Sequence, residues 1–445
     1  MMKRILIADR GEVALRVIRT VKELGIEAIA VYSEADSDMR YLRYADEKVQ
    51  IGPTHPSKSY LNMEAIMSVA LTWKANAIHP GYGFLAENPM FASWCEENGI
   101  VFIGPSSVIL RIIANKARAK DLALSIGIPA IPGSFGEVDN IEDALAMARD
   151  IGMPVMLKSL YGGGGRGMRV ARDEDQLRKL FTRVQSEALA AFGKSGVYIE
   201  HYINSPRHLE VQVMADEFGT IQILGDRECS IQRRHQKIIE EAPIPNIEED
   251  TRKRLWLWAR QIMEAIEFRG LGTVEFLMDQ DGNIYFMEIN GRLQVEHPVT
   301  EMITGMDVVR QQILIAAGAH IDGGKPTIKG HAIECRINAE DPSRNFMPTT
   351  GIIRHVYLPG GPGVRVDTHI FPGCEITSYY DPLLVKLIAY NTTRKGAIKR
   401  MLRMLDETFI QGVTTNKDFL HQLLLNPKFY NGNGDTSLVN TILKQ

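Results

Sequence analysis

Cysteine is scarce in this sequence, and its placement excludes two classes of protein. The 445 residues include only four cysteines, Cys95, Cys229, Cys335 and Cys374, which lie far apart and form no CxxC pair. Cysteine-based zinc sites need such pairs, and disulfide scaffolds are short and rich in cysteine. We therefore expect four reduced thiols with mostly structural roles.

Long apolar runs and a net charge of one sign are also missing. The N-terminal run Ile5–Ala8 is too short for the core of a signal peptide, and no other run approaches the length of a membrane span. The 51 basic and 54 acidic residues are mixed along the chain, so no broad basic surface for nucleic acid or anionic lipid is expected. These absences predict a cytoplasmic protein that binds neither nucleic acid nor membrane.

The sequence does contain a regular alternation of short apolar runs and helical stretches. Hydrophobic residues make up 45% of the chain, and its length suggests two to four domains. In the first hundred residues, apolar runs at 3–9, 26–33, 74–84 and 97–105 are separated by helical patterns such as 13–25. This alternation predicts a parallel sheet covered by helices, whose strand ends often carry ligand loops.

A connection rich in proline and glycine at 128–136 divides the next part of the chain. It leads into a small α+β module with strands expected at 154–158, 168–172 and 196–203. Further short strands and a helix follow, before a final region that begins near Ile328.

The stretch Tyr161–Met168, YGGGGRGM, places five glycines in six positions. A Walker A loop would continue with Lys and Ser or Thr, whereas another strand-like run follows here. Between two strands, the glycines predict a hairpin loop whose bare N–H groups approach phosphate oxygens, with added charge from Lys158 and Arg166. We interpret the run as a mobile lid over a nucleotide, and a merely flexible surface loop is the alternative.

A pair of carboxylates is predicted from a turn signal. Asp281-Gly282 lies between two apolar runs, and a two-residue loop there would set Glu275 directly opposite Glu288, about 5 Å away. Asn290 would share their face of the sheet. Like charges at this distance repel unless a cation lies between them, so the pair predicts a Mg²⁺ or Mn²⁺ site. The alternative is an exposed face with unpaired or protonated glutamates.

A polar row follows the second of these strands. Arg292, Gln294 and Glu296 alternate with the apolar Leu293 and Val295. If the chain stays extended, the three polar side chains project beside the carboxylate pair. Such a row can bind a small anion and supply a base, although taken alone it also fits a surface salt bridge.

Seven motifs, taken in order, resemble the biotin carboxylase family of the ATP-grasp superfamily, and the resemblance covers essentially the whole chain. They are DRGEVALRVIRT, HPGYGFLAEN, YGGGGRGM, SPRHLEVQV, RECSIQRRHQKIIEEAP, GRLQVEHPVTE and ECRINAED. The resemblance implies a mixed α/β and α+β fold in three parts. These are an N-terminal parallel α/β domain at 1–115, an ATP-grasp domain at 116–328 with a mobile lid at about 131–204, and a C-terminal biotin carboxylase domain at 329–445.

The resemblance also implies a reaction, the carboxylation of biotin by bicarbonate and ATP through carboxyphosphate, and a role for each site residue. The ATP site would comprise Lys116, Lys158, Gly162, Gly163, Gly164, Gly165, Glu200, His208 and Gln232, with His235 as a packing or nucleotide-contacting histidine. Magnesium or manganese would be held by Glu275, Glu288 and Asn290. Bicarbonate would be bound by Lys237, Arg292, Gln294 and Val295, with Glu296 as its base and Arg336 at the enolate of biotin.

Four positions depart from the family's pattern. Tyr161 and His201 affect the surroundings of the nucleotide, Gly291 loosens the polar row, and Asp9 replaces the usual Asn beside Arg10. None of these departures removes a catalytic charge.

No Met-Lys-Met sequence for biotin attachment occurs in the chain. We therefore expect biotin on a separate biotin carboxyl carrier protein, a separate carboxyltransferase subunit and, from the resemblance, a homodimer. The final acceptor would be acetyl-CoA, propionyl-CoA, pyruvate or another oxoacid. Two alternatives stay open. One is another ATP-grasp carboxylate-amine ligase, which would not need the polar row beside Arg336, and the other is a weakly active nucleotide-binding partner.

Overall fold

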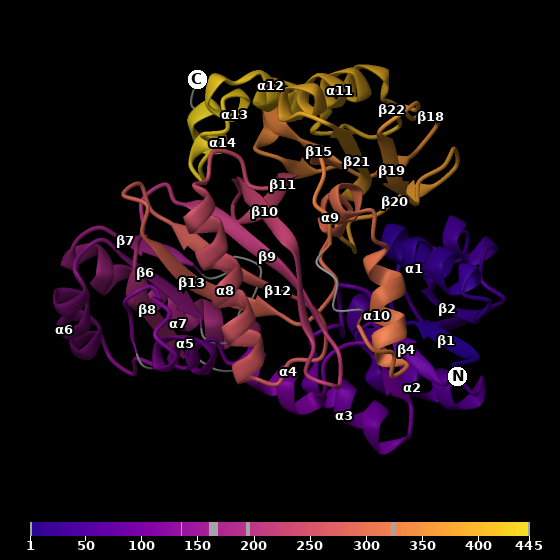
Figure 1. Ribbon diagram of the computed structural model, residues 1–445, viewed down its shortest axis with the longest axis horizontal. Coiled ribbons are helices and arrows are strands. Elements are labelled where there is room, and N and C mark those ends of the chain that lie inside the picture. The colour runs from indigo at the N-terminus through magenta and orange to yellow at the C-terminus, as the bar shows by residue number, and fades with distance from the viewer. Residues whose placement is uncertain (1, 135, 160–167, 193–195, 322–325, 444–445) are drawn as a thin grey trace.

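The computed structural model describes residues 2–134, 136–159, 168–192, 196–321 and 326–443. These residues build a five-stranded sheet near the N-terminus, a small three-stranded sheet and a large eight-stranded sheet. The first two lie at opposite ends of the molecule, with the large sheet between them (Figure 1). No described helix is long and apolar enough to cross a membrane, and all four cysteines are buried and free, as expected.

The N-terminal sheet is parallel throughout, as the alternating pattern predicts, with the strand order β3-β2-β1-β4-β5. Its strands are β1 (Arg4–Ile7), β2 (Glu27–Ser33), β3 (Glu47–Gly52), β4 (Ala77–His79) and β5 (Val101–Phe102). The helices of this region are α1 (Gly11–Glu23), α2 (Met63–Thr72), α3 (Pro89–Glu97) and α4 (Ser107–Ala114). The strand order reverses between β1 and β4, which brings the loops after these two strands together. There the Asp9 carboxylate accepts backbone N–H groups from Arg10, Tyr82 and Gly83.

A small module with its own core follows helix α5 (Lys116–Ser125). Its sheet has the order β7-β6-β8, and its elements are β6 (Val155–Ser159), β7 (Arg169–Ala171), β8 (Val197–His201), α6 (Ile141–Ile151) and α7 (Glu174–Phe192). Leu157 of β6 and Phe181 of α7 belong to its apolar core. Strands β6 and β7 pair antiparallel, as the predicted hairpin requires. The glycines Gly162–Gly165 that would join them lie outside the described residues.

The large sheet is antiparallel and has the order β13-β12-β9-β10-β11-β14-β21-β19. Its strands are β9 (Arg207–Ala215), β10 (Ile221–Arg233), β11 (Gln236–Ala242), β12 (Gly270–Met278), β13 (Ile284–Asn290), β14 (His331–Asn338), β19 (Val364–Thr368) and β21 (Leu383–Asn391). Helix α8 (Glu249–Ala265) packs against β9 and β10. Because β11 pairs with β14, the sheet runs without interruption past Ile328, where the sequence suggests that a new region begins.

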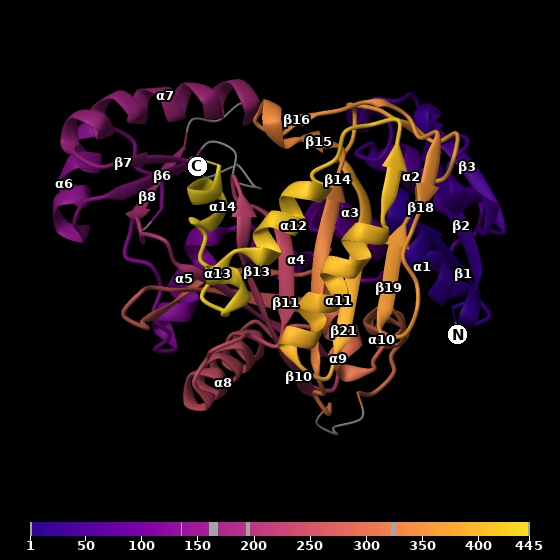
Figure 2. The ribbon, with the colours of Figure 1, turned by 90° about the horizontal axis from the view of Figure 1, so that it is seen from above.

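Two helices that belong to different apolar clusters pack against the C-terminal strands. Helix α9 (His297–Thr304) and helix α11 (Arg394–Glu407) both contact β14 and β21, and Figure 2 shows α11 lying over these strands. The remaining helices are α10 (Val308–Ala316), α12 (Lys417–Leu425), α13 (Pro427–Tyr430) and α14 (Leu438–Ile442). The short strands are β15 (Glu340–Asp341), β16 (Met347–Pro348), β17 (Gly351–Ile352), β18 (His355–Tyr357), β20 (Glu375–Ile376) and β22 (Phe409–Gln411).

The hairpin of β12 and β13 has the predicted pairing of Glu275 with Glu288 but not the predicted loop. A two-residue loop at Asp281-Gly282 is wrong. The N–H of Asp279 donates to the carbonyl of Asn283, which leaves three residues in the loop, and Gly282 has a φ of +84°. Three-residue hairpin loops commonly end with a glycine in this left-handed conformation.

A β-bulge compensates for this longer loop. Near the loop, Met278 pairs with Ile284 and Phe276 pairs with Phe286, which is one residue away from the predicted register. Met287 is the extra residue on β13, and beyond it the register returns to the predicted one. The bulge therefore restores the carboxylate pair to one face of the sheet.

Candidate active site

Glu275 and Glu288 lie opposite each other on the large sheet, and each is met by a lysine. Lys116, the first residue of α5, places its Nζ 2.8 Å from Glu288, and Lys237 of β11 places its Nζ 3.3 Å from Glu275. Asn290 also donates to Glu275 at 2.7 Å. Burial alone would raise the pKa of both carboxyls, but the neighbouring lysines outweigh it and hold both pKa values below the ordinary range. Both glutamates are therefore ionised.

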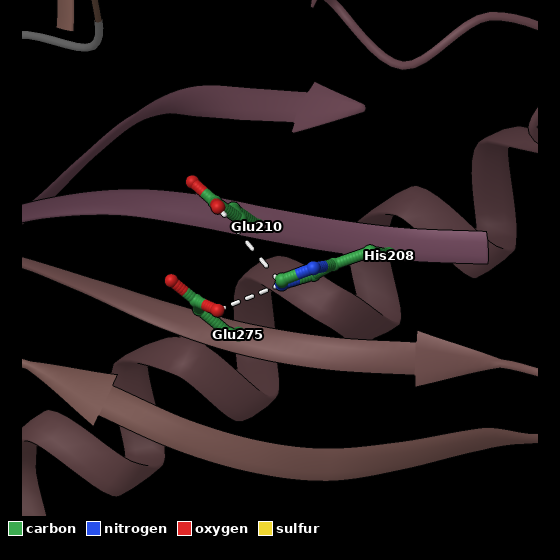
Figure 3. Close-up of side chains that lie close together, drawn as sticks. All are labelled: His208, Glu210 and Glu275. Atoms are coloured by element: carbon green, nitrogen blue, oxygen red, sulfur yellow. Dashed lines mark hydrogen bonds and ion pairs between the residues drawn. The ribbon is translucent and has the colours of Figure 1, made fainter. Parts of the chain in front are cut away.

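His208 and Glu210 of β9 project beside Glu275 of β12 (Figure 3). The Nε2 of His208 lies 2.7 Å from Glu275, and its Nδ1 lies 2.6 Å from the amide nitrogen of Gln232. That amide nitrogen also donates to the carbonyl of Cys229 at 2.8 Å, which fixes the orientation of the amide. An amide nitrogen can only donate a hydrogen bond, so Nδ1 of His208 is the acceptor. Nε2 therefore carries the hydrogen and donates a hydrogen bond to the Glu275 carboxylate.

Glu296, at the start of α9, is clamped between two cations. Its carboxylate lies 2.7 Å from Lys237 Nζ and 2.9 Å from Arg336 Nη2, and only 1% of the residue is exposed. Burial would raise the pKa of this carboxyl, but the charges of Lys237 and Arg336 hold the pKa well below its ordinary value. Glu296 is thus an ionised carboxylate whose basicity depends on where these two cations point.

The polar row forms, although the chain is not extended throughout. Arg292 donates to Gln294 at 3.2 Å and to Asn290 at 3.2 Å, and Leu293 is fully buried on the other side. The assumption of an extended chain is wrong at its end, because the backbone turns at Val295 before α9 begins. This turn carries Glu296 toward Lys237 and Arg336 instead of leaving it in line with the row.

Four further predicted residues lie in different places. Lys158 of β6 and Glu200 of β8 form an ion pair with each other inside the small module. His235 is exposed at the tip of the β10–β11 hairpin, with a φ of +66°. The carbonyl of Val295 accepts a 3.0 Å hydrogen bond from Lys386 of β21.

Two buried charges at the centre of the site were missed by the sequence analysis. Glu210 and Arg227 are fully buried and 2.8 Å apart, and Glu210 also pairs with Lys237. Arg227 and Lys237 balance the charge of Glu210, which lies close to His208 and Glu275. A signal existed, since His208 and Glu210 alternate in the run at 208–213, which places both on one face of a strand.

Glu87, from the loop after β4, was also missed. It accepts the backbone N–H of Gly291 at 3.0 Å and the Nε of Arg292 at 2.9 Å. A Cβ at position 291 would lie 3.0 Å from Pro105, so the unusual glycine fits a tight place. Glu87 therefore fixes the segment that the missing side chain was expected to loosen.

The donor set fits a hard divalent cation. Glu275 and Glu288 supply carboxylate oxygens from adjacent strands, and Asn290 adds an amide oxygen two residues further on. Mg²⁺ and Mn²⁺ prefer such oxygen ligands. In this structure a lysine ammonium group pairs with each of the two carboxylates, which indicates that positive charge is favoured at this position.

The small module lies beside a sheet that carries ionised carboxylates, lysines and an oriented histidine (Figure 1). This arrangement agrees with the ATP-grasp class that the order of the motifs indicates. Comparison with known families narrows the class. Residues 1–110 match the model for the biotin carboxylase N-terminal domain, 115–323 match the ATP-binding domain of the carbamoyl-phosphate synthase L chain, and 334–441 match the biotin carboxylase C-terminal domain.

The chain belongs to the biotin carboxylase family. It is 48% identical over 443 residues to the biotin carboxylase of Nostoc sp., with 99% of both chains covered, and 47% identical over 444 residues to biotin carboxylase 1 of Bacillus subtilis, with the same coverage. Among solved structures, it resembles a biotin carboxylase complex from Campylobacter jejuni with a TM-score of 0.96, 46% identity and 99% coverage of both chains.

A second solved structure is informative because of its ligands. The biotin carboxylase domain dimer of Hydrogenobacter thermophilus 2-oxoglutarate carboxylase, in complex with MgADP, ADP and bicarbonate, matches with a TM-score of 0.96 and 44% identity, covering 99% of this chain and 98% of that chain.

Proposed function

We propose that this protein carboxylates biotin on a separate carrier protein, using ATP and bicarbonate, as the biotin carboxylase subunit of a multisubunit acyl-CoA or oxoacid carboxylase. Membership of the biotin carboxylase family supports the reaction over the whole length of the chain. The observation that carries this proposal is the position of Glu296. Its carboxylate is held between Lys237 and Arg336, and Lys237 also contacts Glu275 of the carboxylate pair. A carboxylate-amine ligase would have no need for that clamp.

We assign the nucleotide to the pocket at the large sheet that is lined by Lys116, Glu288 and Asn290. The residues proposed to bind ATP are Lys116, Lys158, Gly162–Gly165, Glu200, His208, Gln232 and His235, and those proposed for magnesium or manganese are Glu275, Glu288 and Asn290. Magnesium, when bound, offsets the charge on the phosphate oxygens. Lys116 and Lys158 pair with carboxylates in this structure, and we propose that both turn to phosphate when the nucleotide binds. We also propose three domains: an N-terminal domain at 1–115, an ATP-grasp domain at 116–328 with a lid at about 131–204, and a C-terminal domain at 329–445.

Bicarbonate activation follows from the clamp on Glu296. Bicarbonate is a poor nucleophile until its remaining proton leaves. We assign the binding of this anion to Lys237, Arg292, Gln294 and Val295. When Lys237 turns to the anion, Glu296 loses one of its two counter-charges and its pKa rises, so it accepts the proton. The freed oxygen then attacks the γ-phosphate, ADP leaves, and carboxyphosphate forms.

The second half of the reaction uses Arg336. Carboxyphosphate breaks down to CO₂ and phosphate within a closed site, the phosphate takes the N1′ proton of biotin, and N1′ then bonds to the carbon of CO₂ to give carboxybiotin. We assign Arg336 to the enolate oxygen that forms on biotin, since a fixed guanidinium stabilises such a charge. Water must be excluded, because it would disperse CO₂ and hydrolyse the intermediate.

The metal assignment predicts that Glu288→Gln removes the magnesium dependence of nucleotide binding. In the unaltered protein, Mg²⁺ should tighten ADP binding by at least about tenfold, the scale expected when a metal ligand set is intact. In the variant, Lys116 is released to phosphate, so affinity without metal should be kept while the gain from Mg²⁺ disappears. Titration calorimetry with ADP, with Mg²⁺ or with EDTA, measures both. The exposed Glu264→Gln on α8 is the control, and an unchanged magnesium gain in Glu288→Gln would refute the assignment.

The proposed function itself is tested by phosphate release from ATP, Mg²⁺ and bicarbonate, with and without free biotin. A rise in release on adding biotin is expected. Bicarbonate-dependent release that ignores biotin would favour another ATP-grasp ligase. Nucleotide binding without any release would favour the weakly active partner.

The proposed assembly follows the relatives. The matched Hydrogenobacter structure is a dimer, and we propose a homodimer in the cytoplasm that works with a biotin carboxyl carrier protein and a carboxyltransferase subunit. Similar chains include a pyruvate carboxylase from Rhizobium etli, at a TM-score of 0.94 and 42% identity, of which this chain covers 41%. Acetyl-CoA, propionyl-CoA, pyruvate and another oxoacid all remain candidate acceptors.

A further inference from the structure

Arg336 is held by two buried carboxylates rather than one. Its Nη2 contacts Glu240 of β11 as well as Glu296, the latter at 2.9 Å. Glu240 is fully buried, so this ion pair is shielded from water and is strong only while both partners are charged. In the proposed reaction, Glu296 becomes neutral when it takes the proton of bicarbonate. One of the two counter-charges of Arg336 therefore disappears in every cycle.

A third carboxyl, Glu334 of β14, lies directly opposite Glu240 in the register of the two strands. Both residues are fully buried, and none of their four carboxyl oxygens has a hydrogen-bond partner among the described residues, so Glu240 differs from Glu334 by its ion pair with Arg336. Two carboxyl groups side by side in a buried site do not both ionise. Burial raises both pKa values, that of Glu240 to about 6 against the opposing charge of Arg336, and that of Glu334 well above its ordinary value.

The surrounding charges decide which of the two carboxyls is ionised. Besides one another, they face Lys237 from β11, Arg336 from β14, Lys386 from β21 and Glu296 from the start of α9. Arg336 contacts Glu240 directly. No ion pair joins Glu334 to any residue in the described part of the chain. The negative charge thus resides on Glu240, and Glu334 keeps its proton.

We propose that Glu240 is a positioning residue, which holds the guanidinium of Arg336 at the reacting atoms of biotin while Glu296 is neutral, and that Glu334 remains uncharged opposite it. This inference rests on the proposed function. Glu296 is the partner that Arg336 loses and regains, and Glu240 is the partner that it keeps. Both carboxylates contact the same atom of Arg336, Nη2. The Nε of Arg336 has no hydrogen-bond partner among the described residues.

The test compares two activities of one enzyme, both measured by phosphate release from ATP at saturating bicarbonate. The first is release without biotin, and the second is the increment on adding free biotin. Glu240→Gln should lower the biotin-dependent kcat by about 10- to 100-fold, the effect of losing one charged partner of a buried guanidinium. It should lower the biotin-independent activity much less, because Arg336 meets the reacting atoms only in the second step and in the first step affects only the basicity of Glu296.

Two matched variants separate positioning from folding. Glu241, the next residue on β11, is also buried and is paired with Arg394 and His331 instead. Glu241→Gln should lower thermal stability without changing the ratio of the two activities. Glu334→Gln replaces one neutral group with another and should keep both activities. If Glu240→Gln does not fold, Glu240→Asp keeps the charge but shortens its reach, and should lower the biotin-dependent kcat alone.

Three results would overturn the inference. One is an equal loss of both activities in Glu240→Gln or Glu240→Asp, which indicates a structural role. Another is full biotin-dependent activity in these variants. The third is a loss in Glu334→Gln as large as that in Glu240→Gln, which would place the charge on Glu334. Absence of any biotin-dependent increment in the unaltered protein is distinguishable from all three, and it overturns the proposed function together with this inference.

Discussion

The Glu296→Gln variant is expected to lower biotin-dependent ATP turnover by about 10²- to 10⁴-fold, the usual contribution of a positioned general base. Glutamine has the same shape and keeps an oxygen for one cation, so binding of ATP should survive. It cannot take the proton of bicarbonate. The chemical step is therefore lost while the site stays assembled. Phosphate release with ATP, bicarbonate and biotin measures this loss, and nucleotide titration of the same variant confirms that the site is intact.

The structure explains why a base with a low pKa is suited to this task. Lys237 and Arg336 hold the pKa of Glu296 well below its ordinary value, against the effect of burial. In the absence of substrate, the Glu296 carboxylate is therefore ionised and able to accept a proton. In the proposed mechanism, basicity develops only when an incoming bicarbonate draws Lys237 away, which couples proton transfer to the presence of that anion.

The exposed Glu264→Gln on α8 removes the same charge far from the clamp and should retain full turnover. A Glu296→Gln variant with more than about a tenth of the unaltered rate would contradict the role of Glu296 as base, since so small a loss is less than general base catalysis supplies. The pattern of the remaining activity is informative too. Biotin-independent hydrolysis should fall as well, because carboxyphosphate formation also needs the proton removed.

Local periodicity was sufficient to predict a parallel N-terminal sheet, without its strand β3, but not how distant elements pair. The alternating runs of the N-terminal part gave a parallel sheet, because short apolar runs separated by helices leave little other choice. The pairing of β11 with β14 joins residues such as Ile239 and Cys335. Nothing near either strand indicates the other, so the continuous sheet was not predictable from patterns within one segment.

For the site too, contacts within one segment of the chain were predictable, whereas contacts between distant segments were not. The pairing of Glu275 with Glu288 was predicted correctly from a wrong loop, because the bulge at Met287 offsets the extra loop residue. The contact between Glu296 and Arg336 was reachable only through resemblance to a family. Long-range charges such as Lys386, which lies 91 residues from the carbonyl that it binds, gave no signal at all. Ion pairs between distant segments depend on tertiary structure, which the spacing of residues within a segment does not encode.

Lys386→Met is expected to destabilise the fold by about 3–5 kcal/mol, the cost of removing one partner from a buried ion pair. Lys386 is fully buried on β21, and its Nζ lies 3.0 Å from Glu12 of α1 and 3.0 Å from the carbonyl of Val295. Burial would lower the pKa of this lysine, but Glu12 outweighs it and raises the pKa. One ammonium group therefore joins the N-terminal region, the C-terminal strands and the turn that carries Glu296.

Methionine fills a similar volume, so the loss comes from the unpaired charge on Glu12, which keeps the 2.8 Å hydrogen bond from Tyr82 as its side-chain partner among the described residues. Urea unfolding followed by tryptophan fluorescence measures the effect. Adding Glu12→Gln to Lys386→Met should restore a large part of the stability, because it removes the unpaired charge. The exposed Lys395→Met on α11 should change stability by less than about 0.5 kcal/mol. If Lys386→Met alone were as stable as this control, the ammonium group would not be what joins the N-terminal region to the catalytic turn.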